Sequence, residues 1–209
     1  MLTQYDYRHG LVALSILALS LPNLAQAQSF SDVSSEHPVY EAVEYLKEIG
    51  VVAGYDDGTF KPDKSVNRAE AMKLIVAPLV KQEVLAQYTS APYSDVPADA
   101  WYLPYIEYGR TQNIIDGPPK KTAFLGANTV IKAEFLKMLL LAHEVDVQSA
   151  YNEIRLPLAD DAMDVNQWWY PYMRYAITAS MTMVSSQGTM DAGRQLTRGD
   201  TAVLLYRLL

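Results

Sequence analysis

An internal repeat governs any fold that this chain can adopt. The stretches "VNRAEAMKLI", "VIKAEFLKML" and "LTRGDTAVLL" align with one another, and each carries a basic residue at its third position. These basic residues are spaced by 64 and 66 residues: Arg68, Lys132 and Arg198. Eight residues before each of them stands a large apolar residue: Phe60, Phe124 or Met190. A fixed period of this length indicates one supersecondary unit used three times, with a core shared between the units.

Each unit is expected to form a helix, a long turn and a second helix. The first helices are predicted over 38–50, 101–113 and 168–180, where apolar residues recur at the i, i+3, i+4, i+7 spacing of one buried helix face. The inward positions are Val39, Ala42, Val43 and Leu46, then Tyr102, Tyr105, Ile106 and Gly109, then Trp169, Tyr172, Met173 and Ala176. The chain is therefore predicted to be mainly α.

The turn is clearest in the first unit, "GVVAGYDDGTFKP". Gly50 can end a helix in the left-handed conformation, and Gly54 permits another group to approach the backbone closely. Extended pieces of this turn can form short strands. Asp32 and Asp95 stand just before the first two helices, where a carboxylate can cap free N–H groups.

The N-terminus predicts export. Arg8 precedes the apolar stretch "GLVALSILALSLPNL", which leads to small residues at Ala25 and Ala27, so residues 1–27 are expected to be a signal peptide. The apolar part is too short to span a bilayer, and no membrane insertion is expected after cleavage.

Charge and composition exclude several classes of partner. The net charge of -7 argues against nucleic acid, and the absence of cysteine excludes disulfides and thiolate metal sites. Half of the residues are hydrophobic, as in a folded globular protein.

The run "FSDVSSEHPVYEAVEYLKEIGVVAGYDDGTFKPDKSVNRAEAMKLI" resembles an S-layer homology repeat. That family's pattern opens on aromatic-x-Asp-Val, continues to Gly-Tyr-x-Asp-Gly-x-Phe-x-Pro, and closes on Thr-Arg-Ala-Glu. "YSDVPADAWYLPYIEY" with "VIKAEFLKML" is similar, and "WWYPYMRYAITAS" with "LTRGDTAVLL" gives a weaker third copy. The predicted repeats cover 29–88, 92–146 and 156–209.

The resemblance implies three helix-turn-helix repeats packed with pseudo-threefold symmetry around a central three-helix bundle, which the first helices would form. It also implies that grooves between repeats bind an anionic cell-wall polysaccharide, often a pyruvylated one. The expected function is non-covalent anchoring of a secreted protein at the cell wall, without a cofactor. The alternatives are a module that docks another envelope protein, and a tether to peptidoglycan or a linked polymer in a two-membrane envelope.

Arg68 has two interpretations. A helix N-terminus with open N–H groups and a guanidinium is an anion site suited to a carboxylate, which makes Arg68 a ligand-binding candidate together with Lys132 and Arg198. Alternatively, Asn67 and Glu70 form a capping box and leave the arginine as a surface residue. Thr197 is the corresponding cap of the third unit.

Two tryptophans and two glycines are further candidates. Trp101 and Trp168 either offer flat faces to sugar rings in a groove or fill the join between repeats. Gly54 and Gly117 either meet a backbone requirement or allow close approach of a ligand.

The repeats also depart from the family pattern. Pro38 replaces a tryptophan, Lys132 an arginine, and Ile131 a capping threonine; in the third unit Val184 replaces a glycine and Met190 a phenylalanine. If Asp160 corresponds to Asp95, the third unit opens with two extra residues. One or two working grooves are therefore expected, with Arg68 and Gly54 in the best preserved set.

Catalysis and metal binding are not expected. Beyond the signal peptide the histidines are His37 and His143, and neither lies near a nucleophile motif. The pairs Asp56-Asp57 and Asp160-Asp161 are adjacent residues, not a recognisable glycosidase pair, and "YDDGTF" lacks the ligand pattern of a calcium loop.

Overall fold

The computed structural model describes residues 28–91, 93–116, 121–150, 159, 161 and 164–209. The predicted signal peptide and Gly117 lie outside this part. The described residues form seven helices, which confirms the mainly α prediction: α1 (Tyr40–Glu48), α2 (Arg68–Val76), α3 (Gln82–Leu85), α4 (Leu103–Thr111), α5 (Lys132–Ala142), α6 (Tyr170–Thr178) and α7 (Arg198–Leu208). None of these helices is long and apolar enough to cross a membrane.

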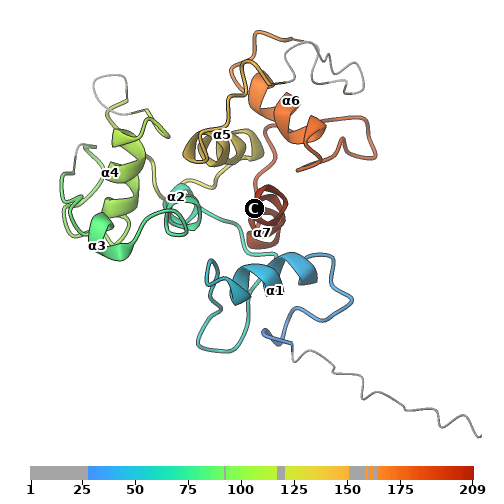
Figure 1. Ribbon diagram of the computed structural model, residues 1–209, viewed down its shortest axis with the longest axis horizontal. Helices are drawn as coiled ribbons and strands as arrows, with labels where there is room; N and C mark the ends of the chain where they lie inside the picture. Colours follow the sequence, from blue (N-terminus) through green and yellow to red (C-terminus); the bar gives the residue numbers. More distant parts are fainter. Residues whose placement is uncertain (1–27, 92, 117–120, 151–158, 160, 162–163) are drawn as a thin grey trace, which may run out of the picture.

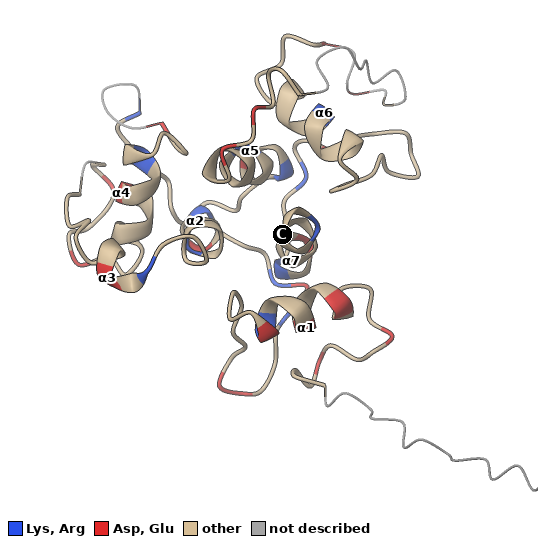
Figure 2. Ribbon diagram, in the orientation of Figure 1, with Lys and Arg blue, Asp and Glu red and all other residues tan. Residues whose placement is uncertain are grey.

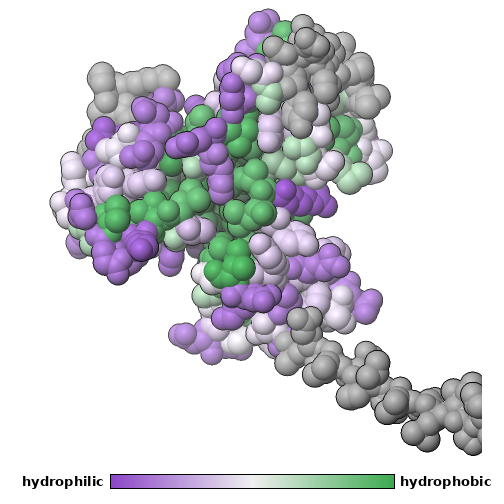
Figure 3. Space-filling model, in the orientation of Figure 1, coloured by the Kyte–Doolittle hydropathy of each residue, from purple (hydrophilic) through white to green (hydrophobic). Residues whose placement is uncertain are grey.

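The second helices of the units, α2, α5 and α7, lie at the centre, and the first helices α1, α4 and α6 lie outside them (Figure 1). The prediction that the first helices form the central bundle is therefore wrong. Burial explains the arrangement: α1 buries one stripe, Ala42, Val43 and Leu46, whereas most of α5 is buried. A helix that is apolar on several faces belongs inside, and an amphipathic helix covers it. Apolar residues also gather over the central helices on the face shown in Figure 3.

The helices of different units interlock. α4 packs on α2, α6 packs on α5, and α1 packs on α7 at the far end of the chain. Each first helix thus pairs with the second helix of the preceding unit in a closed cycle. The two helices of one sequence repeat do not form an independent hairpin.

Three backbone hydrogen bonds close the same cycle. Val66 N–H donates to the Leu196 carbonyl (3.0 Å), Leu196 N–H to that of Val130 (3.0 Å), and Val130 N–H to that of Val66 (2.9 Å). All three side chains are buried. The extended pieces contribute isolated bridges here, and no longer strand occurs among the described residues.

The local signals of the first helices are confirmed. Gly50 follows α1 with φ of 75°, and Asn113 and Ser180 hold the equivalent positions at φ of 59°. Most predicted inward residues are buried; the half-buried ones are Val39, Tyr102, Trp169 and Tyr172.

The aspartates before the first helices do not cap them, so that prediction is wrong. Asp32 accepts from the N–H groups of Phe60 (2.7 Å) and Lys61 (2.8 Å), at the end of the long turn. Asp95 holds Phe124 (2.8 Å) and Leu125 (2.7 Å) in the same way.

In the third unit this role falls to Asp161, while Asp160 lies outside the described residues. Asp161 accepts from Met190 (2.7 Å) and Asp191 (3.0 Å). Counted from this aspartate, the opening of the third unit is one residue longer than that of the second, not two.

Candidate ligand-binding groove

The first two N–H groups of each central helix donate to carbonyls in the loop of a neighbouring unit, so they are not open to an anion as the anion-site hypothesis requires. Arg68 N–H donates to the Asn128 carbonyl (2.9 Å) and Ala69 N–H to that of Gly126 (3.1 Å). The next N–H, of Glu70, donates to Asn67 Oδ1 (2.8 Å), and the Glu70 carboxylate accepts from Asn67 N–H (3.0 Å). The capping box is therefore confirmed. Thr197 and Asp200 form the same box on α7. The loop of a neighbouring unit supplies the carbonyls, and this partner was invisible in the local sequence.

The basic side chain that opens each central helix ties two units together. Arg68 Nε donates to the Phe124 carbonyl (3.1 Å), Lys132 Nζ to that of Met190 (2.9 Å), and Arg198 Nε to that of Phe60 (2.9 Å). The basic residue and the large apolar residue of the repeat pattern are thus partners across units. Lys and Arg of the central helices accordingly lie near the middle of the molecule (Figure 2).

The side chains of Lys132 and Arg198 are engaged in these contacts within the protein. Lys132 is only 5% exposed, and burial lowers the pKa of its ammonium. The Arg198 guanidinium lies over the rings of Tyr55 and Phe60, and its Nη2 donates to the Ala53 carbonyl (3.2 Å). The hollow beside Arg198 has no space for a water molecule.

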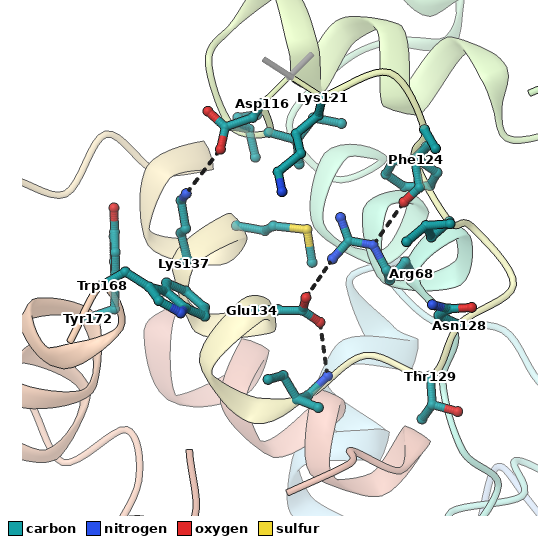
Figure 4. A pocket seen from close by; sticks show the side chains of 16 residues that line it. Arg68, Asp116, Lys121, Phe124, Asn128, Thr129, Glu134, Lys137, Trp168 and Tyr172 are labelled. Atoms are coloured by element: carbon teal, nitrogen blue, oxygen red, sulfur yellow. Dashed lines mark hydrogen bonds and ion pairs between the residues drawn. The ribbon is translucent and has the colours of Figure 1, made fainter. Parts of the chain in front are cut away.

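Arg68 differs because it lines an open groove of about 790 Å³ (Figure 4). The groove lies between the N-terminus of α2, the long turn of the second unit, α5 and the start of α6. Trp168, which precedes α6, and Tyr172 of α6 form the side opposite Arg68, with Lys137 and Glu134 of α5 between them. The structure thus brings together two predicted residues, Arg68 and Trp168, from the first and third units.

The groove holds charges of both signs. Arg68 Nη1 lies 3.2 Å from Glu134 Oε1, and Lys137 Nζ lies 3.7 Å from Asp116 Oδ2. Lys121 also lines the groove and has no ion pair with another described residue. The Arg68 side chain is 19% exposed and rests on the Phe124 ring, with 5.2 Å from Cζ to the ring centroid.

The tryptophans are surface residues, so their interpretation as buried packing is wrong. Trp168 is 50% exposed with Lys137 Nζ 5.8 Å from its ring centroid, and Trp101 is 55% exposed with Lys73 Nζ at 5.7 Å. Trp101 does not line the groove. At the third join, Pro38 and Val203 stand where this aromatic-cation pair would be.

Comparison with known proteins decides the family. The S-layer homology domain matches residues 29–72 and 92–136. This chain is an S-layer homology domain protein.

Three similar proteins have names that refer to the surface layer, the cell wall or anchoring. The Surface-layer 125 kDa protein of Lysinibacillus sphaericus is 28% identical over 203 residues, 96% of this chain and 16% of that protein. The Middle cell wall protein of Brevibacillus brevis is 29% identical over 148 residues, 67% of this chain and 14% of that protein. The Cellulosome-anchoring protein of Acetivibrio thermocellus is 30% identical over 144 residues, 68% of this chain and 31% of that protein. The chain spans less than a third of each relative's length.

The third unit keeps the contacts of the two matched S-layer homology units. Asp161 holds the turn as Asp32 and Asp95 do, and Arg198 reaches a carbonyl as Arg68 does.

Gly54 has a packing reason of its own. A Cβ at this position would lie 2.4 Å from Phe30 Cε1 and 2.8 Å from the Thr59 carbonyl oxygen. Gly54 is thus required by the aromatic ring that opens the first S-layer homology unit, and it is not among the residues that line the groove.

Several groove residues were missed by sequence reasoning: Asp116, Lys121, Glu134, Lys137 and Tyr172. Lys137 had a usable signal, because it stands five residues after Lys132 as Lys73 does after Arg68. The other residues are marked only by their position in space.

Proposed function

We propose that the protein attaches to the cell wall by binding an acidic wall polysaccharide in the groove between Arg68 and Trp168. The observation that carries the proposal is the groove itself, where basic side chains and two aromatic rings from different S-layer homology units line one open space. Family membership makes this a secreted protein of the cell surface.

The basic groups give the groove its preference for acids. Arg68 uses Nε and one contact of Nη1 within the protein, while its Nη2 has no hydrogen bond with another described residue. Nη2 and the Lys121 ammonium can therefore donate to a carboxylate such as a pyruvyl ketal. Charge-assisted hydrogen bonds contribute about 1.5–3 kcal/mol each, so two or three of them with stacking on Trp168 reach micromolar affinity, about -8 kcal/mol.

The other two joins are poorer sites. At one, Lys132 is buried and Pro38 stands at the position of the tryptophan; at the other, Arg198 uses its Nε and Nη2 to donate to two carbonyls. We therefore assign binding to one principal groove, and Lys132, Arg198 and Trp101 are not retained as its ligands.

The names of the relatives support anchoring rather than catalysis. They include surface-layer proteins and a cellulosome-anchoring protein. The Amylopullulanase of Thermoanaerobacterium thermosulfurigenes is 24% identical over 183 residues, but these make up 10% of that enzyme. The likeness is thus confined to a small part of it.

Co-sedimentation with protein-free cell walls tests the proposal. The protein is expected to pellet with the walls, and acid extraction of the secondary polymer should abolish pelleting. Binding to a purified envelope protein instead, or to peptidoglycan that acid extraction leaves intact, would favour the alternative partners.

Matched variants locate the binding site. Trp168→Ala and Lys121→Ala change exposed groove residues and should each weaken wall binding about tenfold or more, from the loss of one stacking contact or one charge-assisted bond. Trp101→Ala is the control. Trp101 is about as exposed as Trp168 and also lies under a lysine side chain, Lys73, but it is outside the groove. Equal losses in Trp101→Ala and Trp168→Ala would reject the assignment to this groove.

A further inference from the structure

One carboxylate in the groove lacks a partner that its counterparts have. The third residue of each central helix is acidic: Glu70, Glu134 or Asp200. In the first unit, Glu70 pairs with Lys64 of the same unit at 3.3 Å. In the third unit, Asp200 pairs with Arg194 of the same unit at 2.8 Å.

The second unit has Asn128 at the position of Lys64 and Arg194. The equivalence of these three positions is structural, because their carbonyls accept from the first N–H of the preceding unit's central helix in the same way: Asn128 from Arg68, Lys64 from Arg198, and Arg194 from Lys132. A neutral amide thus replaces a cation beside Glu134, and Asn128 also lines the groove.

Glu134 consequently turns toward the groove. It lies 3.4 Å from the N–H of Ile131, compared with 3.0 Å between Glu70 and Asn67, so its own cap bond is long. Its close ion pair is with Arg68 of another unit. Asp116 adds a second carboxylate to the same groove, and each carboxylate lies next to a basic residue (Figure 4).

We propose that the groove binds a zwitterionic sugar unit, one that carries both an acidic group and a free ammonium group. The inference rests on the proposed function and narrows its ligand. The ammonium takes the place beside Glu134 that Lys64 and Arg194 occupy in the other units, and the acidic group meets Arg68 and Lys121. A purely acidic ligand would meet not only Arg68 and Lys121 but also the carboxylates of Glu134 and Asp116, which repel it even though each of them has a basic neighbour. The ammonium of a zwitterionic unit offsets this repulsion.

Blocking amino groups on the wall tests the proposal directly. Protein-free walls are treated with acetic anhydride, which converts ammonium groups to neutral acetamides and keeps carboxylates. The wild-type protein should bind the N-acetylated walls about tenfold more weakly than untreated walls, the worth of one charge-assisted contact. Equal binding to both preparations would overturn the zwitterion proposal and leave wall binding intact. Failure to bind untreated walls would reject the proposed function, and this inference with it.

A variant that supplies the cation internally sharpens the test. Asn128→Lys copies the residue of the first unit, so its backbone fits the position, and its ammonium should pair with Glu134. This variant should bind untreated and N-acetylated walls alike. Ala127→Lys is the control. Ala127 is exposed, and a lysine there adds the same charge one residue away from the position that is expected to pair with Glu134. A tenfold preference for untreated walls that persists in Asn128→Lys would contradict the role given to Glu134.

Discussion

Asp95 fixes the turn that carries Phe124, and its removal gives a calculable loss of stability. The Asp95 carboxylate accepts from Phe124 N–H (2.8 Å) and Leu125 N–H (2.7 Å). Leu125 has φ of 60°, a conformation that a branched residue adopts only under constraint. Asp95→Ala removes both hydrogen bonds and leaves this backbone unsupported.

The two hydrogen bonds contribute unequally to the free energy of unfolding. The bond to Phe124 is partly buried, whereas the bond to Leu125 is exposed, so water replaces the carboxylate at Leu125 at little cost. A charge-assisted bond contributes about 1.5–3 kcal/mol when shielded, and Asp95 is itself exposed. The expected loss is therefore about 2 kcal/mol, mostly from Phe124.

Urea unfolding followed by circular dichroism measures this loss. With a slope of about 2 kcal/mol per molar urea, the midpoint should fall by about 1 M. Asp99→Ala, in the same exposed loop and without a bonded partner among the described residues, should change the free energy of unfolding by less than about 0.5 kcal/mol.

Acid supplies a second check. Burial acts to raise the pKa of Asp95, but the N–H groups of Phe124 and Leu125 outweigh it and lower the pKa. The contribution is thus present above the unfolded pKa of about 3.9 and is lost as the pH falls through the lower folded value. Wild type and Asp95→Ala should differ most at neutral pH and converge below about pH 4. A difference that is absent at pH 7, or that grows in acid, would refute the reasoning.

Three further outcomes follow from the packing. Gly54→Ala should destabilise the protein by about 1–3 kcal/mol through its clash with Phe30, while Gly193→Ala, with nothing within 4 Å of its Cβ, should be close to neutral in the same thermal scan. Lys132→Ala should lower the free energy of unfolding by about 2–4 kcal/mol, because it leaves a cavity and an unpaired Met190 carbonyl. The control Lys121→Ala changes an exposed residue and should lower it by less than about 0.5 kcal/mol. An equally small loss for Lys132→Ala would exclude a structural role for Lys132. Gly199→Val should push α1 away from α7, since a Cβ added at Gly199 would lie 3.1 Å from Val39 Cγ1. Hydrogen exchange should then accelerate more in α1 than in α4, and unchanged protection of α1 would contradict the interlocked arrangement.

The local part of this structure could be predicted from the sequence. The repeat register, the capping box at Asn67 and the left-handed Gly50 follow from neighbouring residues, because helix ends satisfy their own hydrogen bonds with nearby groups. The apolar stripe of each first helix was likewise readable from its period.

The pairing between distant segments could not be predicted in this way. An apolar face does not say which helix will cover it, so the central position of α2, α5 and α7 was missed. Asp95 has its partners 29 and 30 residues later, and Arg68 finds its carbonyl on Phe124, 56 residues later. The groove depends on such long-range partners, because its charged residues come from segments that lie far apart in the sequence.

The cycle of bonds through Val66, Leu196 and Val130 also determines how this protein can come apart. A linear array of repeats frays from its ends, since a terminal repeat touches one neighbour only. Here the first and last units hold each other, so neither is an end, and opening any one join strains the other two. Unfolding should therefore be all-or-none and slow, since no unit can detach by itself.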